Sequence, residues 1–350
     1  MPGEVITRAA TAEDDQRIKA VWEDAFPPPT LGGTKTYLPY LKWLHEDNPD
    51  ASSTATKFWL AEIDNDVIGV WGTTPVKFTI NQESVDAVWS QNTAVASRGQ
   101  RKGVGKKLFR FAKLNSPLYL GIGTTGQSYT MFAAEGVHFV EADPFWTLLI
   151  SKRKALRRAA GAMARFRVST AVTFLKQAIY SSTLSAQKDI SVNDVQRFDG
   201  ATDRFLNDLR IPVMASRNSG KLNWVLSNPR IRPVAFVAKS NGRVMGYAIM
   251  RQDGKILELL VSPGDKAAFR ALAKSIMLWA NKRGIEEIGG IVPPLLADLY
   301  SGVGFCHLIN TFGLFYAYRD KEQRNPTLDD PRNWFISLAD SDLFTFQMTE

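Results

Sequence analysis

The sequence predicts an α/β protein of the α+β kind, built from two tandem copies of one unit. Each unit is expected to be a mixed, mostly antiparallel sheet flanked by helices. Three observations predict this architecture. The chain has 350 residues, more than one hydrophobic core usually serves. Segments with the period of a strand alternate with segments of helical period. A series of short motifs occurs twice in the same order.

The repeated series indicates an internal duplication. In each half, a helix carrying a tryptophan (Trp43 or Trp224) is followed by Asn-Pro and then by two strands joined at an Asn-containing turn. The residue before a proline avoids helical geometry, so Asn-Pro ends the helix. An Asn-centred turn between two apolar runs predicts a β-hairpin. Near the ends of the halves, Glu135-Gly136-Val137 and Val303-Gly304-Phe305 occupy corresponding places.

The first half reads as a strand, two helices and three antiparallel strands, followed by helix, strand, helix and two strands. Strands are expected where apolar and polar residues alternate, and helices where apolar residues recur at every third and fourth position. The expected strands are 5–10, 58–63, 67–80, 84–96, 118–123, 138–141 and 145–151, and the expected helices are 13–25, 35–45, 104–115 and 128–135.

The second half repeats this order over residues 192–318. Its expected helices are 203–209, 221–226, 266–283 and 295–301. The expected divisions of the chain are a first domain at 1–151, a basic helical linker at 152–190, a second domain at 191–320 and a tail at 321–350. Trp334 and Phe335 are expected to pack the tail back onto the protein.

The run Gln100-Arg101-Lys102-Gly103-Val104-Gly105 is the segment whose chemistry can be named. It lies between a predicted strand and a predicted helix. Two glycines in such a turn let the backbone approach a ligand closely. The unpaired amides of the first helical turn, together with the positive end of the helix dipole, favour an anion. Lys102, Lys106 and Lys107 add positive charge, so a phosphate or pyrophosphate is the expected guest.

Three phosphate-binding patterns compete for this loop. The P-loop needs Gly, four residues and then Gly-Lys-Ser/Thr, and the sequence has no such run. The dinucleotide fingerprint needs three glycines, and two fit. The third is the pattern Q/R-x-x-G-x-G/A, to which Gln100, Gly103 and Gly105 conform at every fixed position. An ordinary basic turn before a surface helix is the alternative without a ligand.

On these residues the chain resembles the GNAT superfamily of N-acyltransferases. Val95 and Ser97 stand where that family has a valine-x-proline lead-in, with Ser97 in place of the proline. The resemblance extends over nearly the full length, to tandem GNAT proteins with one working and one degenerate half. In the GNAT fold the fourth and fifth strands run parallel but splay apart, and acyl-CoA lies between them.

The resemblance implies that the loop amides hold the pyrophosphate of coenzyme A and that the preceding strand pairs with its pantetheine arm. The residues that it implies for binding acetyl-CoA are Val95, Gln100, Arg101, Lys102, Gly103, Val104, Gly105 and Lys106. At the corresponding place the second half reads Ser262-Pro263-Gly264-Asp265. It lacks a second glycine and a basic cluster, and Asp265 would repel a pyrophosphate. The second half is therefore expected to be degenerate.

The residues that would carry out catalysis are less well defined. Family members commonly have a tyrosine four residues before the glycine of a Gly-Phe pair, and this tyrosine is the general acid that protonates the thiolate. In the first half that position is Phe132, so Tyr129, one helical turn earlier, is the candidate acid. Tyr300 has the matching position in the second half and is expected to be a packing residue. The base is not identified, and Gln91, Asn92 or Thr93 could each relay a water.

The first two helices are expected to line the acceptor pocket, together with the loop of residues 27–33. Tyr37, Tyr40 and Trp43 lie nearby and could stack on a sugar ring, although structural packing is the commoner reason for such aromatics. Similar tandem proteins often belong to surface-polysaccharide or amino-sugar pathways. The resemblance therefore makes an amino sugar of polysaccharide or glycan biosynthesis the first acceptor to consider.

Taken together, these features predict an acetyl-CoA-dependent N-acetyltransferase that moves an acyl group to a primary amine of a small molecule by direct attack in a ternary complex. The alternatives are a non-catalytic acyl-CoA-binding or scaffold protein and a membrane-surface adaptor. Three separate histidines, with no cysteine or carboxylate spacing around them, argue against a metal site. The sequence has a single cysteine and shows no signal-peptide pattern or apolar run long enough to span a membrane, and these features predict a cytoplasmic location. The oligomeric state stays open.

The basic segment between the halves could have either of two roles. The chain has a net charge of +8, and its positive residues are concentrated between Lys152 and Arg167. No nucleic-acid-binding module accompanies them, so nucleic acid is not an expected partner. Apolar residues at roughly helical spacing would allow weak peripheral membrane contact through residues 152–180. A linker helix packed across both domains is the alternative.

Overall fold

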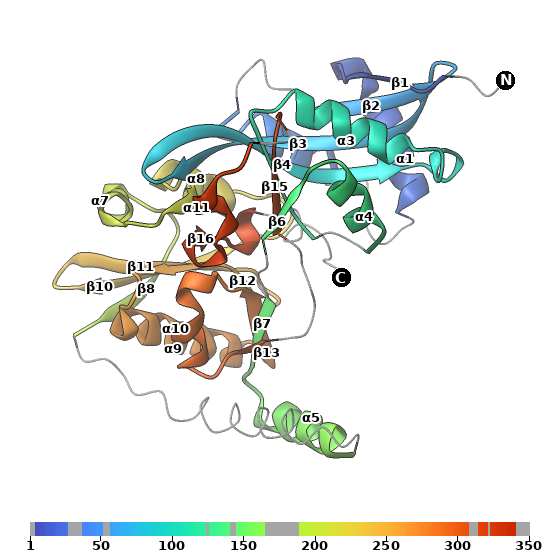
Figure 1. Ribbon diagram of the computed structural model, residues 1–350. Helices are drawn as coiled ribbons and strands as arrows, with labels where there is room; N and C mark the ends of the chain where they lie inside the picture. Colours follow the sequence, from blue (N-terminus) through green and yellow to red (C-terminus); the bar gives the residue numbers. More distant parts are fainter. Residues whose placement is uncertain are drawn as a thin grey trace.

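The computed structural model describes residues 4–26, 37–51, 57–123, 126–140, 145–164, 189–307, 314–320 and 323–340. Within these residues two mixed sheets are stacked, with helices on their outer faces and between them (Figure 1). This is the α+β architecture that the sequence predicts. No helix in the described part of the chain is long and apolar enough for a membrane crossing.

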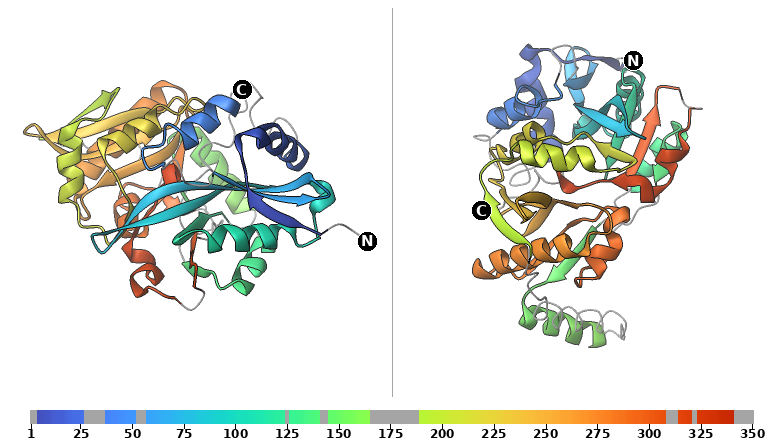
Figure 2. Two further views of the ribbon diagram at one scale, coloured as in Figure 1. Left: turned by 90° about the horizontal axis from the view of Figure 1, so that it is seen from above. Right: turned by 90° about the vertical axis from the view of Figure 1, so that its left-hand side faces the viewer.

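The first sheet begins with an antiparallel series of four strands, β1 (Ile6–Ala9), β2 (Phe58–Ile63), β3 (Asp66–Ile80) and β4 (Glu83–Val95), and β5 (Leu118–Ile122) then pairs with β4 in parallel. Two helices, α1 (Asp15–Ala25) and α2 (Tyr37–His45), cover one face (Figure 2). The other face carries α3 (Val104–Leu114) and α4 (Gly126–Ala134). The side chains of α3 and α4 belong to a second hydrophobic core, separate from that of α1 and α2.

The second sheet repeats this arrangement. Its antiparallel strands are β8 (Ser191–Val195), β10 (Val234–Ser240), β11 (Arg243–Met250) and β12 (Lys255–Val261), and β13 (Glu287–Ile291) pairs with β12 in parallel. The accompanying helices are α7 (Gly200–Asp208), α8 (Ser219–Leu226), α9 (Lys266–Lys282) and α10 (Ala297–Ser301). Both predicted hairpins are present, and the left-handed Asn65 and Asn241 lie in their turns. The duplication therefore holds in three dimensions.

The two halves exchange their last strands. The strand expected at residues 145–151 forms as β7 (Phe145–Leu149), but it pairs with β13 and with β14 (Cys306–His307) in the second sheet. In return β15 (Leu314–Tyr318) enters the first sheet between β5 and β6 (His138–Val140). The repeat in the sequence does not predict this exchange. Each sheet is complete only with a strand from the other half.

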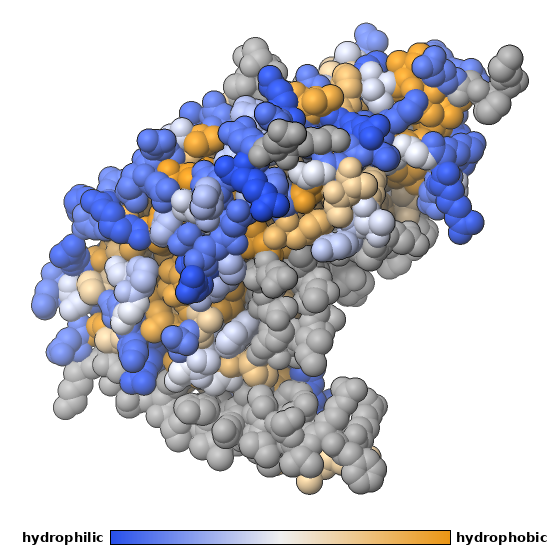
Figure 3. Space-filling model, in the orientation of Figure 1, coloured by the Kyte–Doolittle hydropathy of each residue, from blue (hydrophilic) through white to orange (hydrophobic). Residues whose placement is uncertain are grey.

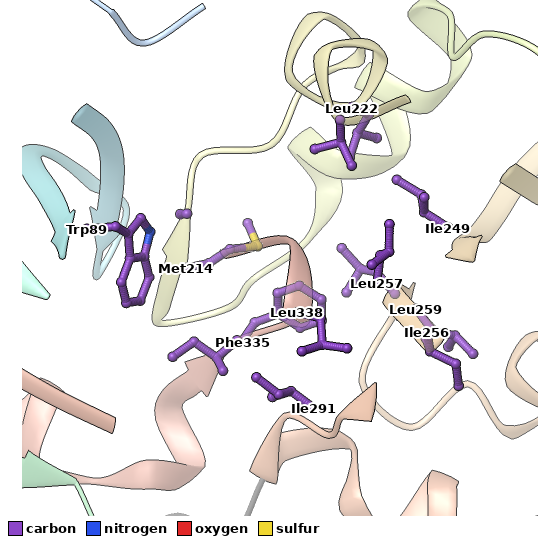
Figure 4. Close-up of a cluster of buried hydrophobic side chains, with 14 of the residues drawn as sticks. Trp89, Met214, Leu222, Ile249, Ile256, Leu257, Leu259, Ile291, Phe335 and Leu338 are labelled. Atoms are coloured by element: carbon purple, nitrogen blue, oxygen red, sulfur yellow. The ribbon is translucent and has the colours of Figure 1, made fainter. Parts of the chain in front are cut away.

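The last described residues, up to residue 340, pack between the two sheets. Trp334 and Phe335 form β16 and are fully buried, which confirms that the tail folds back onto the protein. This strand pairs with β9 (Val213–Ala215), which in turn pairs with β3 of the first sheet. The neighbouring α11 (Pro326–Asp329) contacts β6. Figure 4 shows Phe335 and Leu338 among side chains from both halves, from Trp89 on β4 to Ile291 on β13.

Candidate functional site

The glycine loop joins β4 to α3 through a short turn with left-handed residues. Gly103 precedes the helix with φ of 75°, a conformation that favours glycine, and Arg101 has φ of 60°. No side chain caps this end of α3. The helix is held to the sheet by Val104, Leu108 and other buried residues. Its first-turn amides are therefore fixed in place and available to an anion.

Next to this loop, β4 separates from β5. The two strands pair in parallel only at Val88 with Tyr119 and at Trp89 with Leu120, while β4 continues to Val95. Opposite Trp71 of β3 the register of β4 shifts by a bulge, where Asn92 has φ of 51°. A bulge re-aims side chains and interrupts the strand ladder. The gap expected between diverging fourth and fifth strands is thus present.

A hollow of about 760 Å³ lies at the start of α3, beside the last residues of β4. It brings together most of the residues that the sequence predicts for coenzyme A. Of the predicted residues, its lining contains Val95, Gln100, Arg101, Gly103, Val104, Gly105 and Lys106. Thr93, a candidate to relay a water, also lines it. The other lining residues, which the sequence did not single out for binding, are Ala25, Phe26, Trp71, Ala94, Gly99, Ser128 and Met131. Lys102 is exposed and does not line it. No local sequence signal marks Phe26, Trp71 or Met131, because core aromatics and methionines look the same.

The two loop glycines leave room for a ligand. A Cβ added at Gly103 would have no atom within 4 Å, and one added at Gly105 would meet only Val95 Cγ2, at 3.9 Å. Gly105 has no left-handed backbone angle, so its lack of a side chain is not required by the turn. The open space in front of it belongs to the hollow. This space is where a bound phosphate would meet the amides of α3.

The positive charge at the loop is smaller than the sequence suggests. Lys106 Nζ lies 3.3 Å from Oε1 of Glu135, and Arg110 Nε donates to Oε2 of the same carboxylate at 2.6 Å. The Glu135 side chain is fully buried, and it raises the pKa of Arg110. Lys107 Nζ donates to the carbonyl of Val5 instead of facing the hollow. Backbone amides therefore supply much of the attraction for an anion.

The structure distinguishes the three polar residues of the β4 bulge. Gln91 accepts a hydrogen bond from Thr74 Oγ1 at 3.1 Å, and the Asn92 carbonyl accepts one from Trp22 Nε1 at 2.9 Å. Thr93 lines the hollow, and its Oγ1 is buried with no hydrogen-bond partner in the described part of the chain. Because this oxygen is buried, the hydroxyl would have to change its χ1 angle to reach a ligand in the hollow.

The expected acid lies outside the hollow. Tyr129 is 51% exposed and stacks on Phe139, with ring centroids 4.1 Å apart. Figure 3 shows hydrophobic residues exposed on this face in the region of β6 and α4. Phe132 is buried against Trp71, Phe109 and the exchanged Phe315.

Tyr119 lies close to the hollow but is not accessible from it. It is fully buried and accepts a hydrogen bond from Trp71 Nε1. Burial raises the pKa of its phenol well above the ordinary value. A group that keeps its proton so tightly is a poor donor to a leaving thiolate.

Two of the aromatic residues considered for acceptor stacking, Tyr40 and Trp43, pack within the protein, which is the commoner role of such residues. Tyr40 is 1% exposed, with Arg230 over its ring at 4.1 Å, and Trp43 is 2% exposed and stacks on Trp224. The loop of residues 27–33 and the side chain of Tyr37 lie outside the described residues. On the acceptor side, the described lining consists of Phe26 and its neighbours from α1 and β4.

The second half has the same frame but no corresponding anion site. β12 and β13 also diverge after two paired residues, Lys255 with Gly289 and Ile256 with Gly290. However, Asp265 caps α9 and accepts a hydrogen bond from the Ala268 amide at 2.9 Å. Its carboxylate thus occupies the helix end that would face a phosphate. The sequence expectation that Asp265 opposes pyrophosphate binding has this physical basis.

The chain's own polar groups occupy the interior of the second half beside β12. The Arg217 guanidinium forms ion pairs with Glu258 and with Asp340, the latter at 2.7 Å. The Ser337 hydroxyl donates a hydrogen bond of 2.9 Å to the Glu258 carboxylate. Tyr300 is buried against Phe269 and Phe305, and burial raises the pKa of its phenol. The packing role expected for Tyr300 agrees with this position.

No family model matches the chain, and no curated protein matches it. Solved structures do. A GCN5-related N-acetyltransferase from Anabaena variabilis is similar over 91% of this chain and 73% of its own, with a TM-score of 0.61 and 11% identity. A tandem GNAT protein from the clavulanic acid biosynthesis pathway is similar over 91% of this chain and 99% of its own, with a TM-score of 0.55 and 11% identity. The chain has a tandem GNAT fold.

A third similar structure is a GCN5-related glucosamine N-acetyltransferase region within a fungal multi-domain GH3 β-N-acetylglucosaminidase. It matches 90% of this chain and 38% of its own, with a TM-score of 0.54 and 14% identity. In the tandem GNAT fold described above, the hollow lies in the first unit, at the end of β4 and the start of α3. Within the described residues of the chain, no group of three histidine, cysteine or carboxylate side chains could hold a metal ion.

Proposed function

We propose that the protein is an acetyl-CoA-dependent N-acyltransferase whose working site is the hollow of the first half. The observation that carries this proposal is the continuity of that hollow, which runs from the uncapped start of α3 to the bulge of β4. An anion site and a reaction centre at the two ends of one cavity suit a long, phosphate-bearing thioester. The second half, with Asp265 at its helix end, would serve as structural support.

The chain offers distinct groups to each part of this cosubstrate. The amides of Val104, Gly105 and Lys106 would hold the pyrophosphate, with Gln100 and Arg101 at the rim. The edge of β4 near Val95, left free by β5, would pair with the pantetheine arm. Bound acetyl-CoA supplies an acyl group already activated as a thioester. Holding the amine next to it can provide up to about 7–11 kcal/mol of the barrier reduction in ideal cases.

Thr93 is the side chain that we assign to the reaction centre. Its hydroxyl has a donor with no acceptor among the described residues, and the residue lines the hollow. The nitrogen of an attacking amine must direct its lone pair at the carbonyl carbon, so the thioester oxygen is the acceptor left for this donor. A donor aimed at an oxygen that gains charge lowers the barrier. Backbone amides of β4 near Val95 would add to this effect.

The thiolate needs less help to leave. A thiol has a pKa of about 8.5, so its anion is a moderate leaving group at neutral pH. Tyr129 is the acid that the sequence favours, but its half-exposed ring stacks on Phe139 outside the hollow. We therefore propose that water protonates the thiolate and that Tyr129 contributes little.

The acceptor that we propose is a primary amine of a small molecule, and amino sugars are the class that we favour. The glucosamine N-acetyltransferase region that shares this fold supports that choice, as does the sequence resemblance to tandem proteins of such pathways. Attack would be direct, in a ternary complex, because no nucleophilic cysteine lines the hollow in the described part of the chain. A cytoplasmic location is part of the same proposal.

The deciding experiment couples calorimetry with a free-thiol assay. Titration of the purified chain with acetyl-CoA should release or absorb heat with one site per chain. Thiol release from acetyl-CoA should then depend on an added amine, tested with glucosamine, other amino sugars, amino acids and polyamines. Binding without turnover across this panel would favour a non-catalytic acyl-CoA-binding protein, an alternative to which Phe132 in place of tyrosine lends weight. Absence of binding would remove both.

A further inference from the structure

The helix α5 (Lys152–Ala164) stands apart from the site described above. It follows β7 and lies at the end of the molecule farthest from the first sheet (Figure 1). The catalytic proposal assigns it no role. Its two faces differ in what they contact.

The inner face of α5 is attached to the second half. Ala155 and Ala159 are buried, and two cations on this face are neutralised. Lys154 Nζ lies 3.1 Å from the Glu287 carboxylate, and Arg158 Nη2 lies 3.0 Å from it. These contacts fix the orientation of the helix, so its other face has a defined direction.

The outer face combines large apolar side chains with positive charge. Leu156 is 55% exposed and Met163 is 53% exposed, and residues seven apart share one side of a helix. Among the described residues six large hydrophobic side chains are exposed, and two of these six lie on this one helix. Arg157 is exposed beside Leu156. A single exposed leucine would need no explanation, but this pairing does.

In the sequence, positive charge is concentrated in this helix and in the segment that follows it. Residues 151–188 contain nine lysines and arginines and no aspartate or glutamate, whereas the complete chain has a net charge of +8. The remainder of the protein is therefore close to neutral. Two of these nine cations, Lys154 and Arg158, are paired with Glu287, and a partner that recognises the segment by its other charges must be anionic.

Exposed aliphatic side chains distinguish the kinds of anionic partner. Nucleic acid binds cations through its phosphates and stacks bases on aromatic rings, and neither contact uses Leu156 or Met163. A helix at a membrane surface uses both groups, because its apolar side enters the boundary between headgroups and acyl chains while its cations meet lipid phosphates. We propose that α5 docks this protein on an anionic membrane surface, with Leu156 and Met163 entering the boundary and Arg157 at the headgroups.

The test uses the full chain and sedimentation with lipid vesicles. Vesicles of phosphatidylcholine with phosphatidylserine should carry the protein down, and vesicles of phosphatidylcholine alone should not. Raising the salt from low values to about 0.15 M should weaken the binding. Leu156→Ser combined with Met163→Ser should reduce the partition coefficient at least about tenfold, and Arg157→Gln should reduce it about fivefold.

Leu278→Ser is the matched control. Leu278 is 52% exposed on α9, so this substitution removes a similar side chain from another helix and should leave vesicle binding unchanged. Thermal unfolding of all variants should match the original chain. Unchanged binding of the Leu156→Ser, Met163→Ser chain would overturn the proposal, as would an equal loss with Leu278→Ser. Binding to a single-stranded RNA without binding to vesicles would overturn it in favour of nucleic acid.

Discussion

Trp43 and Trp224 stack face to face, with ring centroids 4.2 Å apart and planes 3° from parallel. Each indole Nε1 donates a hydrogen bond of 2.8 Å to the backbone carbonyl of the other. These two residues are the tryptophans of the duplicated helix end, so the sequence repeat generates a symmetric contact between the halves. The duplication thus provides one of the contacts that join its two copies.

This contact should be important for the stability of the whole protein. We expect Trp224→Ala to lower the free energy of unfolding by about 3–5 kcal/mol, because it leaves a cavity, removes the ring stack and removes the hydrogen bond that the Trp224 indole donates. Urea unfolding followed by circular dichroism would measure this change. Trp279→Ala, which affects a less buried tryptophan on α9, should cost less. An equal decrease in the free energy of unfolding for the two variants would mean that the stacked pair does not stabilise the protein more than another tryptophan does.

The glycine loop should determine coenzyme A affinity. Gly105→Val places methyl groups in the hollow without backbone strain, so calorimetric affinity for acetyl-CoA should fall at least about tenfold, or about 1.4 kcal/mol. Gly200→Val, at an equally open first turn of α7, should leave affinity unchanged.

Gly103 can be tested in the same way against its counterpart in the second half. Both Gly103 and Gly264 have left-handed backbone angles, with φ of 75° and 88°, so valine strains either one equally. Gly103→Val should weaken acetyl-CoA binding at least about tenfold, and Gly264→Val should not weaken it. Equal affinity of Gly103→Val and the original chain would remove the loop from the binding site.

The role of Thr93 predicts a change in turnover without a change in binding. Thr93→Val keeps the shape and removes the hydroxyl, so kcat should fall at least about tenfold while calorimetric affinity for acetyl-CoA stays the same. Thr93→Ser should restore most of the loss. Tyr129→Phe should change kcat less than about threefold, since the ring lies outside the hollow. A large loss with Tyr129→Phe would return the acid role to that tyrosine.

His45 should make the protein less stable in mild acid. Burial lowers the pKa of this imidazole from 6.5 to about 3, and neither ring nitrogen has a hydrogen-bond partner in the described part of the chain. The unfolded chain takes up a proton as the pH falls below about 6.5, but the folded protein does not until about pH 3. Stability is therefore lost as pH falls through this window, by up to about 1.4 kcal/mol per unit from this group.

The histidine contribution can be isolated by substitution. His45→Phe keeps the contact with Phe58 and removes the titrating group, so its stability should depend less steeply on pH between 7 and 5. Urea unfolding at several pH values would show the difference in slope. An identical slope in the two proteins would contradict the assignment. The same variant should be at least as stable as the original at pH 7, because two unsatisfied nitrogens are removed.

The exchanged strand should be sensitive to a single methyl group. A Cβ at Gly121 on β5 would lie 2.1 Å from Cζ of Phe315 on β15. We expect Gly121→Ala to cost about 1–3 kcal/mol of stability through overpacking. The penalty should shrink in a chain that also carries Phe315→Leu, and Gly200→Ala should cost little. An equal penalty in both backgrounds would mean that these residues do not meet.

The local elements of this protein could be predicted from its sequence. Apolar periodicity, Asn-Pro stops and Asn-centred turns act over a few residues, so the hairpins, the helices and the glycine loop lie where the pattern indicates. The uncapped start of α3, on which the proposed anion site depends, also follows from the local sequence. The difference of the second loop could also be predicted, because Asp265 caps the helix that follows it and capping depends only on neighbouring residues.

The sequence by itself determined the duplicated units, their order and the glycine loop before α3, because each of these depends on neighbours along the chain. Tertiary structure decided which sheet receives β7 and β15, since a strand has the same pattern of apolar residues whichever partner it joins. It also decided that Thr93 lines the hollow whereas Gln91, Asn92 and Tyr129 do not. Those outcomes depend on contacts between distant segments, which local chemistry does not encode.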